Sequence, residues 1–75
     1  MKIYLIQYNS DDSCYDSFLA HIIVANTIDE VKMLAKNQSA DEGIEIWDTA
    51  EVSIEGDYTG KSTEAFILLS DFNAG

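Results

Sequence analysis

The chain has 75 residues, of which 14 are acidic and four are basic, so that its formal net charge is -10 at pH 7. All the basic residues are lysines, and arginine, the side chain that most often reads phosphate and guanine, is absent. This balance argues against direct binding to nucleic acid or to an anionic membrane, and it favours a protein partner with a basic surface. The same acidity could also serve only to keep the protein soluble.

Length and cysteine usage predict a single compact domain, residues 1–75, in the cytoplasm. Cys14 is the only cysteine, which leaves neither an intramolecular disulfide nor a cysteine-based zinc site. Residues 1–8 are too short and too polar for the apolar core of a signal peptide. The longest apolar run, residues 65–69, is far shorter than a membrane span.

Two strands joined by a polar loop are predicted at the start of the chain. Residues 2–8 are rich in Ile, Leu and Tyr, residues 9–13 are polar, and residues 15–25 form the second strand. We expect the even-numbered side chains of this strand to face the core, namely Phe18, Ala20, Ile22 and Val24. The opposite face is only partly polar and carries Tyr15, Ser17, Leu19, His21 and Ile23.

The segment "TIDE", residues 27–30, predicts the start of a helix that runs to about Asn37. Thr27 is the expected N-cap with Glu30 three residues later, and Asp29 suits the positive end of the helix dipole. The spacing of three and four residues places one apolar stripe toward the core, formed by Ile28, Val31, Leu34 and Ala35. Lys32 and Lys36 are expected on the outer side.

The second half of the chain predicts two further strands. Residues 37–43 form a loop, and residues 44–47 are either a short strand or a turn. Residues 50–55 alternate, with Ala50, Val52 and Ile54 inward and Glu51, Ser53 and Glu55 outward. Residues 64–70 form the last strand. The expected fold is α+β, in the order β-β-α-β-β, with one helix on one face of an antiparallel sheet of about four strands.

The segment "GDYTGKST", residues 56–63, has the ending of a Walker A motif but fails as one. Only three residues separate Gly56 from Gly60, where the motif needs four, and Lys61 is followed by a predicted strand instead of a helix. Asp57 would also place a carboxylate in the phosphate cradle. We therefore expect a β-hairpin connection in which both glycines adopt positive φ.

No other segment predicts catalysis or a bound cofactor. The acidic stretch 11–16 lacks the glycine and the ligand spacing of a calcium loop, and the stretch 41–45 is too short to form one. His21 is a lone histidine in an apolar strand with no partner carboxylate in view, and the aspartates around Cys14 would raise the pKa of its thiol. We therefore expect a non-enzymatic protein without metal or cofactor. A metal-binding or hydrolytic protein is a further alternative.

The acidic residues of the second half of the chain form the predicted partner-binding surface. Alternate strand residues point the same way about 6.6 Å apart, so a row of carboxylates can imitate a nucleic-acid backbone. Trp47 and Tyr58 would anchor the contact, although Trp47 could instead close the core beneath the 38–49 loop. Asp11, Asp12 and Asp16 form a separate group. The predicted set is Asp41, Glu42, Glu45, Trp47, Asp48, Glu51, Glu55, Asp57 and Tyr58.

In layout the chain resembles the small accessory proteins of phages and mobile elements, including anti-CRISPR proteins. The segments that carry this resemblance are "MKIYLIQY", "YDSF", "VANTIDEVKMLAK" and "FILLSDFNAG". It implies a stoichiometric inhibitor in a host bacterial cell that occupies the basic DNA-binding surface of a CRISPR complex or nuclease. The alternative is a structural or regulatory module that self-associates through a strand edge as a homodimer and buries Leu19, His21 and Ile23 against a second copy.

Overall fold

A computed structural model describes residues 1–9 and 16–74 and confirms the α+β fold in the order β-β-α-β-β. The predicted start of the second strand at residue 15 lies outside the described residues, as do Asp11, Asp12 and Cys14. Of the segment 44–47, expected as a strand or a turn, residues 45–47 belong to a short 3-10 helix and Ile44 is its N-cap. The elements are β1 (Lys2–Gln7), β2 (Ser17–Ala25), α1 (Ile28–Asn37), η1 (Glu45–Asp48), β3 (Glu51–Asp57) and β4 (Phe66–Asn73).

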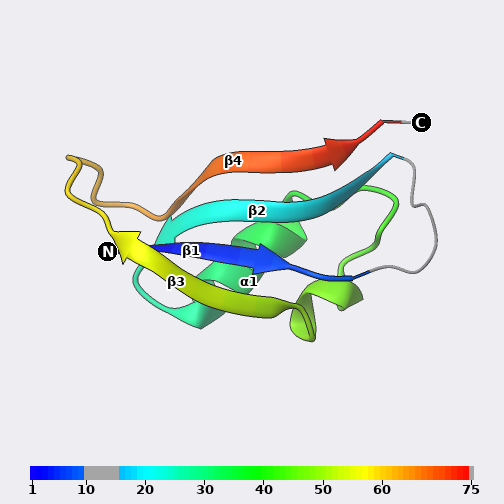
Figure 1. The fold of residues 1–75 in the computed structure, drawn as a ribbon, viewed down its shortest axis with the longest axis horizontal. Helices are drawn as coiled ribbons and strands as arrows, with labels where there is room; N and C mark the ends of the chain where they lie inside the picture. Colours follow the sequence, from blue (N-terminus) through cyan, green and yellow to red (C-terminus); the bar gives the residue numbers. More distant parts are fainter. Residues whose placement is uncertain (10–15, 75) are drawn as a thin grey trace.

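The four strands form one antiparallel sheet in the order β3-β1-β2-β4 (Figure 1). β1 and β2 are the central pair, and β3 and β4 are the two edges. Because β3 and β4 lie on opposite edges, residues 58–65 cross the end of the sheet. The prediction of a hairpin connection here is therefore wrong. The rejection of a Walker A motif agrees with the structure, since this segment leads into β4 and not into a helix.

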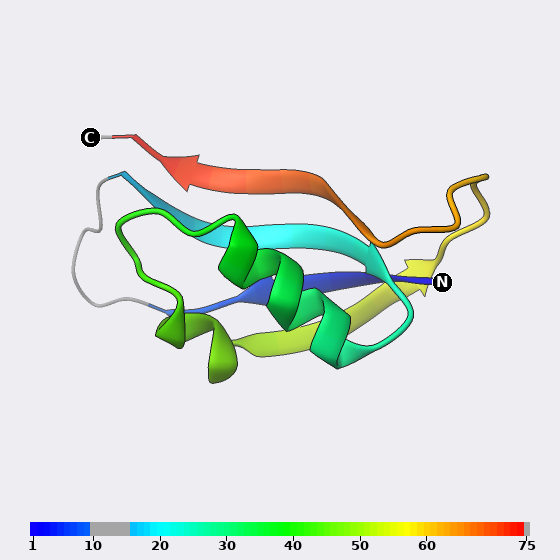
Figure 2. The same cartoon turned by 180° about the vertical axis from the view of Figure 1, so that it is seen from behind.

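Helix α1 lies across one face of the sheet, and its start is capped as the sequence predicts (Figure 2). Thr27 Oγ1 accepts a hydrogen bond from the Glu30 backbone N–H at 3.2 Å. Glu30 Oε1 in turn accepts from the Asn26 N–H at 2.9 Å, one residue before the N-cap. Val31 and Ala35 are fully buried against the sheet. These contacts fix the helix on the core.

One member of the predicted helix stripe does not reach the core. Ile28, in the first turn, is 48% exposed, whereas Leu34 packs against the buried cluster. The core cluster lies between α1 and the sheet and consists of Tyr4, Ile6, Ile23, Ala25, Val31, Ala35 and Trp47.

The prediction for the two faces of β2 is wrong: the odd-numbered side chains face the helix. His21 pairs with Ile6 and Ile23 pairs with Tyr4, and all four are buried on the α1 side. Strand alternation therefore places Ala20, Ile22 and Val24 on the opposite face, although Val24 is fully buried there, as predicted for a core residue. Both faces of this strand are apolar, so alternation alone could not decide between them.

Two consequences follow from this inversion. His21 and Ile23 are 1% and 0% exposed, so the predicted self-association through Leu19, His21 and Ile23 would need the core to open. Phe18 still packs against the core, because a register shift between Phe18 and Ala20 interrupts the alternation. Ala20, Ile22 and Val24 then belong to a sheet face that α1 does not cover (Figures 1 and 2).

The positive φ predicted for Gly56 and Gly60 occurs at neither residue. Among the described glycines, only Gly43 has a positive φ, at 81°. Gly56 lies inside β3 with open space where a Cβ would stand. At Gly60 a Cβ would lie 2.3 Å from Tyr58 Oη, so a side chain there would require the Tyr58 ring to shift.

Two glycine substitutions test this distinction. Gly43→Ala forces an L side chain into the left-handed region and should reduce the free energy of unfolding by about 1 kcal/mol. Gly56→Ala is the matched control, and it should leave stability unchanged or raise it by a few tenths of a kcal/mol. Urea denaturation followed by tryptophan fluorescence measures both. Equal losses for the two variants would contradict the assignment.

Candidate functional site

The predicted partner-binding residues fall into two groups in the structure. One group is used inside the fold and contains Glu42, Trp47, Asp48, Asp57 and Tyr58. The other group consists of exposed carboxylates, Asp41, Glu45, Glu51 and Glu55.

Glu42 holds the loop between α1 and η1 against the sheet. Its Oε1 accepts hydrogen bonds from the backbone N–H groups of Phe18 at 3.0 Å and Ala40 at 3.1 Å. Its Oε2 accepts from Trp47 Nε1 at 3.1 Å. A carboxylate with this many donors is strongly fixed, because hydrogen bonds to a charged acceptor exceed neutral ones in strength. Glu42 is therefore a structural residue and not a free surface charge.

Trp47 is completely buried and closes the core beneath the 38–49 loop. Its ring meets Tyr8 edge-on with a centroid distance of 5.1 Å, and His21 at 5.0 Å. The exposed anchor predicted for this residue is thus wrong, and the alternative of a lid is correct. An indole in an acidic stretch became buried because Glu42 satisfies its only N–H.

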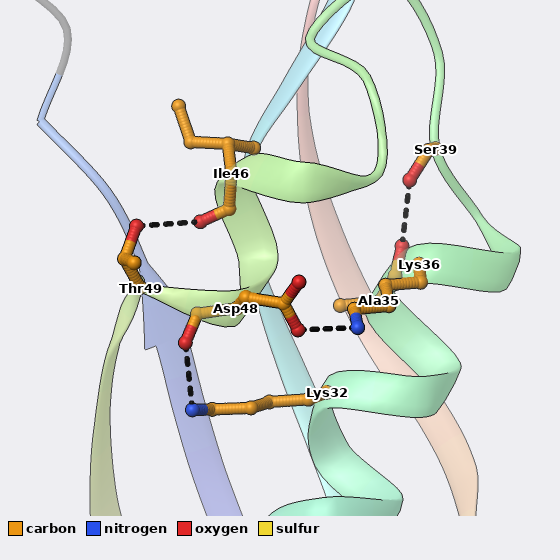
Figure 3. A network of polar contacts seen from close by, with 7 residues as sticks. All are labelled: Lys32, Ala35, Lys36, Ser39, Ile46, Asp48 and Thr49. Atoms are coloured by element: carbon orange, nitrogen blue, oxygen red, sulfur yellow. Dashed lines mark hydrogen bonds and ion pairs between the residues drawn. The ribbon is translucent and has the colours of Figure 1, made fainter.

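Asp48 joins η1 to the helix (Figure 3). Its carboxylate forms an ion pair with Lys36, and its backbone carbonyl accepts from Lys32 Nζ at 2.9 Å. Thr49 Oγ1 approaches the Ile46 carbonyl at 3.5 Å, and Ser39 Oγ donates to the Ala35 carbonyl at 3.2 Å. The lysines expected on the outer side of α1 therefore face η1.

The two remaining members of the internal group lie at the end of β3. Asp57 pairs with Lys2, and this hydrogen bond and charge lower the pKa of the Asp57 carboxyl. The Tyr58 ring packs edge-on against Phe66 with a centroid distance of 5.6 Å, and its hydroxyl accepts from the Ser62 N–H at 3.3 Å. Asp57 thus joins β3 to β1, whereas Tyr58 links residues within the crossing 58–65 to the start of β4.

The exposed carboxylates Glu45, Glu51 and Glu55 follow η1 and β3 along one edge of the sheet, and we call them the acidic row. Within the part of the chain that the structure describes, no ion pair involves any of them. Glu51 lies opposite Gln7 in the register of β3 on β1, and Glu55 accepts from Ser53 Oγ at 2.6 Å. The two carboxylates therefore belong to the sheet face away from α1. Asp41 is exposed in the loop before η1.

Sequence reasoning missed an apolar hollow on that same face. It has a volume of about 380 Å³ and is lined chiefly by β1, β2 and β4, at Leu5, Ala20, His21, Ile22, Leu69, Ser70 and Asp71. Leu69 is 64% exposed. The signal for it was present in the apolar character of both faces of residues 18–24, but the face assignment was inverted.

Over residues 1–9 and 16–74, no group of three or more His, Cys, Asp or Glu side chains is placed to hold a metal ion. No helix in these ranges is long and apolar enough to cross a membrane. His21 is enclosed by Phe18 and Trp47, and its Nδ1 pairs with Ser70 Oγ at 2.7 Å.

No family model, curated protein or solved structure matches the chain. The candidate site therefore stands on geometry and charge alone.

The role of Glu42 is tested by Glu42→Gln. The amide turns one acceptor into a donor that faces the donors around it, so the free energy of unfolding should fall by about 1–3 kcal/mol. Glu45→Gln is the matched control in the same segment, and an exposed site of this kind should change stability by no more than about 0.5 kcal/mol. Urea denaturation compares them, and equal effects would refute the structural role of Glu42.

His21 should make stability depend on pH. Burial lowers the pKa of His21, and the charge of Glu42 opposes this shift only in part. Its Nε2 is buried without a hydrogen-bond partner, which further disfavours the protonated ring. The folded state therefore binds the proton less tightly than the unfolded state, so stability is complete above the unfolded pKa of about 6.5 and falls as pH drops below it.

His21→Phe provides the comparison. Its free energy of unfolding should change less than that of the wild type between about pH 7.5 and pH 5.5, since it lacks the group that titrates near pH 6.5. The free energy of unfolding at a series of pH values measures this. The same pH dependence in both proteins would exclude His21 as the cause.

Proposed function

We propose that the protein is a non-enzymatic, acidic inhibitor that binds the basic nucleic-acid-binding surface of another protein and blocks DNA from binding there. A CRISPR complex or nuclease of the host bacterium is the proposed target, on the strength of the resemblance in layout to anti-CRISPR proteins. The observation that carries the proposal is the acidic row on a sheet edge, whose carboxylates form no ion pair among the described residues.

The division of the acidic residues supports this role. Two of the acidic residues form ion pairs that join elements of the fold, Asp57 with Lys2 and Asp48 with Lys36. Glu51 and Glu55 are left without such partners among the described residues, on backbone that the β1–β3 pairing fixes. Fixed charges lose little conformational freedom when a partner binds, so they favour affinity more than charges on a mobile segment.

The net charge of -10 sets the long-range behaviour. An acidic molecule is attracted to the same positive groove that attracts DNA, and such steering raises association rates at low salt. A groove lined with Lys and Arg would meet the acidic row in place of phosphates. The contact would therefore compete directly with DNA.

The proposal is tested by competition with a fluorescent target duplex for purified CRISPR complexes of several types. The wild type should displace the duplex from at least one complex, and more weakly at about 300 mM than at about 50 mM salt. Glu51→Lys combined with Glu55→Lys should weaken the displacement by about tenfold or more, because two attractions become repulsions. Fluorescence anisotropy of the duplex gives the apparent affinity.

The matched control is Asp29→Lys combined with Glu64→Lys, which changes the net charge equally but away from the acidic row. It should inhibit nearly as well as the wild type at physiological salt. Melting temperatures verify that both double variants remain folded. Failure of the wild type to displace DNA from any complex, or equal losses in the two variants, would overturn the proposal.

A further inference from the structure

The sheet face opposite α1 has an apolar floor that the described chain leaves partly open around Leu5, Ile22 and Leu69, although Val24 on the same face is fully buried. Ile3 and Leu5 of β1 alternate away from the core, and Leu5 lies beside Ile22 of β2, which pairs with Leu69 of β4. These last three side chains meet in the hollow of about 380 Å³. Figures 1 and 2 show the helix on the other side of the sheet only.

Carboxylates stand on both sides of this floor. Glu51 and Glu55 belong to β3, at one edge of the sheet. Asp71 pairs with Ala20 from β4, at the other edge, and also lines the hollow. All three side chains are exposed. The face is therefore an apolar strip with negative charge along both flanks.

None of the lysines, all of which lie in the described ranges, is placed on this strip. Lys2 pairs with Asp57, and Lys32 and Lys36 contact η1 on the helix side. Lys61 lies in the crossing at the end of the sheet. A second copy would bring its own carboxylates to the flanks and no cation to meet them. Charge complementarity thus favours a basic occupant over a homodimer.

The width of the strip fits a helix. Three strand spacings of about 4.8 Å separate β3 from β4, which places the acidic flanks about 14 Å apart. A helix with its side chains is about 10–12 Å across. Lysine or arginine side chains on the sides of such a helix would reach the carboxylates while its apolar stripe rests on Leu5, Ile22 and Leu69.

The geometry points to this face as the docking site for an amphipathic helix of the partner protein, with an apolar stripe bordered by Lys or Arg. The inference deepens the proposed function and rests on it for the basic character of the partner. It adds that apolar contact, and not charge alone, holds the complex together.

A labelled peptide of leucine and lysine tests this surface directly. A length of about 18 residues spans the sheet at 1.5 Å rise per residue, with the leucines on one helical face. Fluorescence anisotropy should show binding of this peptide and at least tenfold weaker binding of a scrambled peptide with no apolar stripe. Amide chemical-shift changes should fall on β1, β2 and β4 around the hollow and spare Val31 and Ala35.

Leu69→Ser should weaken binding of the amphipathic peptide by about tenfold, because the exposed Leu69 side chain would become buried against the bound peptide. Leu68→Ser is the matched control, since Leu68 is 56% exposed on the same strand but does not line the hollow. It should change the affinity by less than about twofold. Circular dichroism establishes that both variants are folded, and the shift map of the wild type decides the location of binding independently.

Several results would overturn the inference. Equal binding of the scrambled peptide, or no effect of Leu69→Ser, would show that charge alone holds the peptide, and the proposed inhibition of DNA binding would still stand. A wild-type dimer that Leu69→Ser converts to a monomer would show that a second copy occupies the face.

The opposite outcome separates this inference from the proposed function. Peptide binding on the hollow without displacement of DNA from any complex would retain this site and refute the proposed function.

Discussion

The position of Trp47 depends on one carboxylate. Glu42 accepts hydrogen bonds from β2, from the loop after α1 and from the indole of Trp47. Burying an indole N–H without a partner costs several kcal/mol in an apolar site, so the ring could not fill this end of the core unaided. With its N–H bonded to Glu42, Trp47 contacts Tyr8 and His21 and closes the space between the loop and the sheet. A residue of the acidic stretch thus completes the hydrophobic core.

This use of Glu42 changes the meaning of the net charge. A cluster of acids read from sequence looks like one surface, but the fold divides it. Asp48 and Asp57 are neutralised by lysines from α1 and β1, where they join elements together. Glu45, Glu51 and Glu55 take part in no ion pair among the described residues. Charges without a structural task are the ones that can be assigned to recognition.

Local signals predicted the fold well, and long-range choices limited the prediction of the site. The cap at Thr27 and the inward position of Val52 depend on neighbours within four residues, so the sequence contains both. Ile54, predicted inward by the same alternation, is instead 60% exposed on the edge strand β3. Which face of β2 becomes buried depends on the side of the sheet on which α1 packs. Because both faces of this strand are apolar, the sequence does not determine that side. The internal role of Glu42 depends on Phe18, 24 residues away, and no local pattern encodes such a contact.

A chain with one ten-residue helix can cover only one face of a four-stranded sheet. The side with Tyr4, Ile6 and Ile23 is covered, and the side with Leu5, Ile22 and Leu69 is left to solvent or to a partner. The flanking carboxylates raise solubility in the free state, which makes such an apolar strip tolerable. The flanking carboxylates also restrict which proteins can bind the apolar strip, since an acidic or neutral partner would leave the carboxylates unpaired. The same charge that raises solubility would therefore also favour a basic partner on this face, as proposed above.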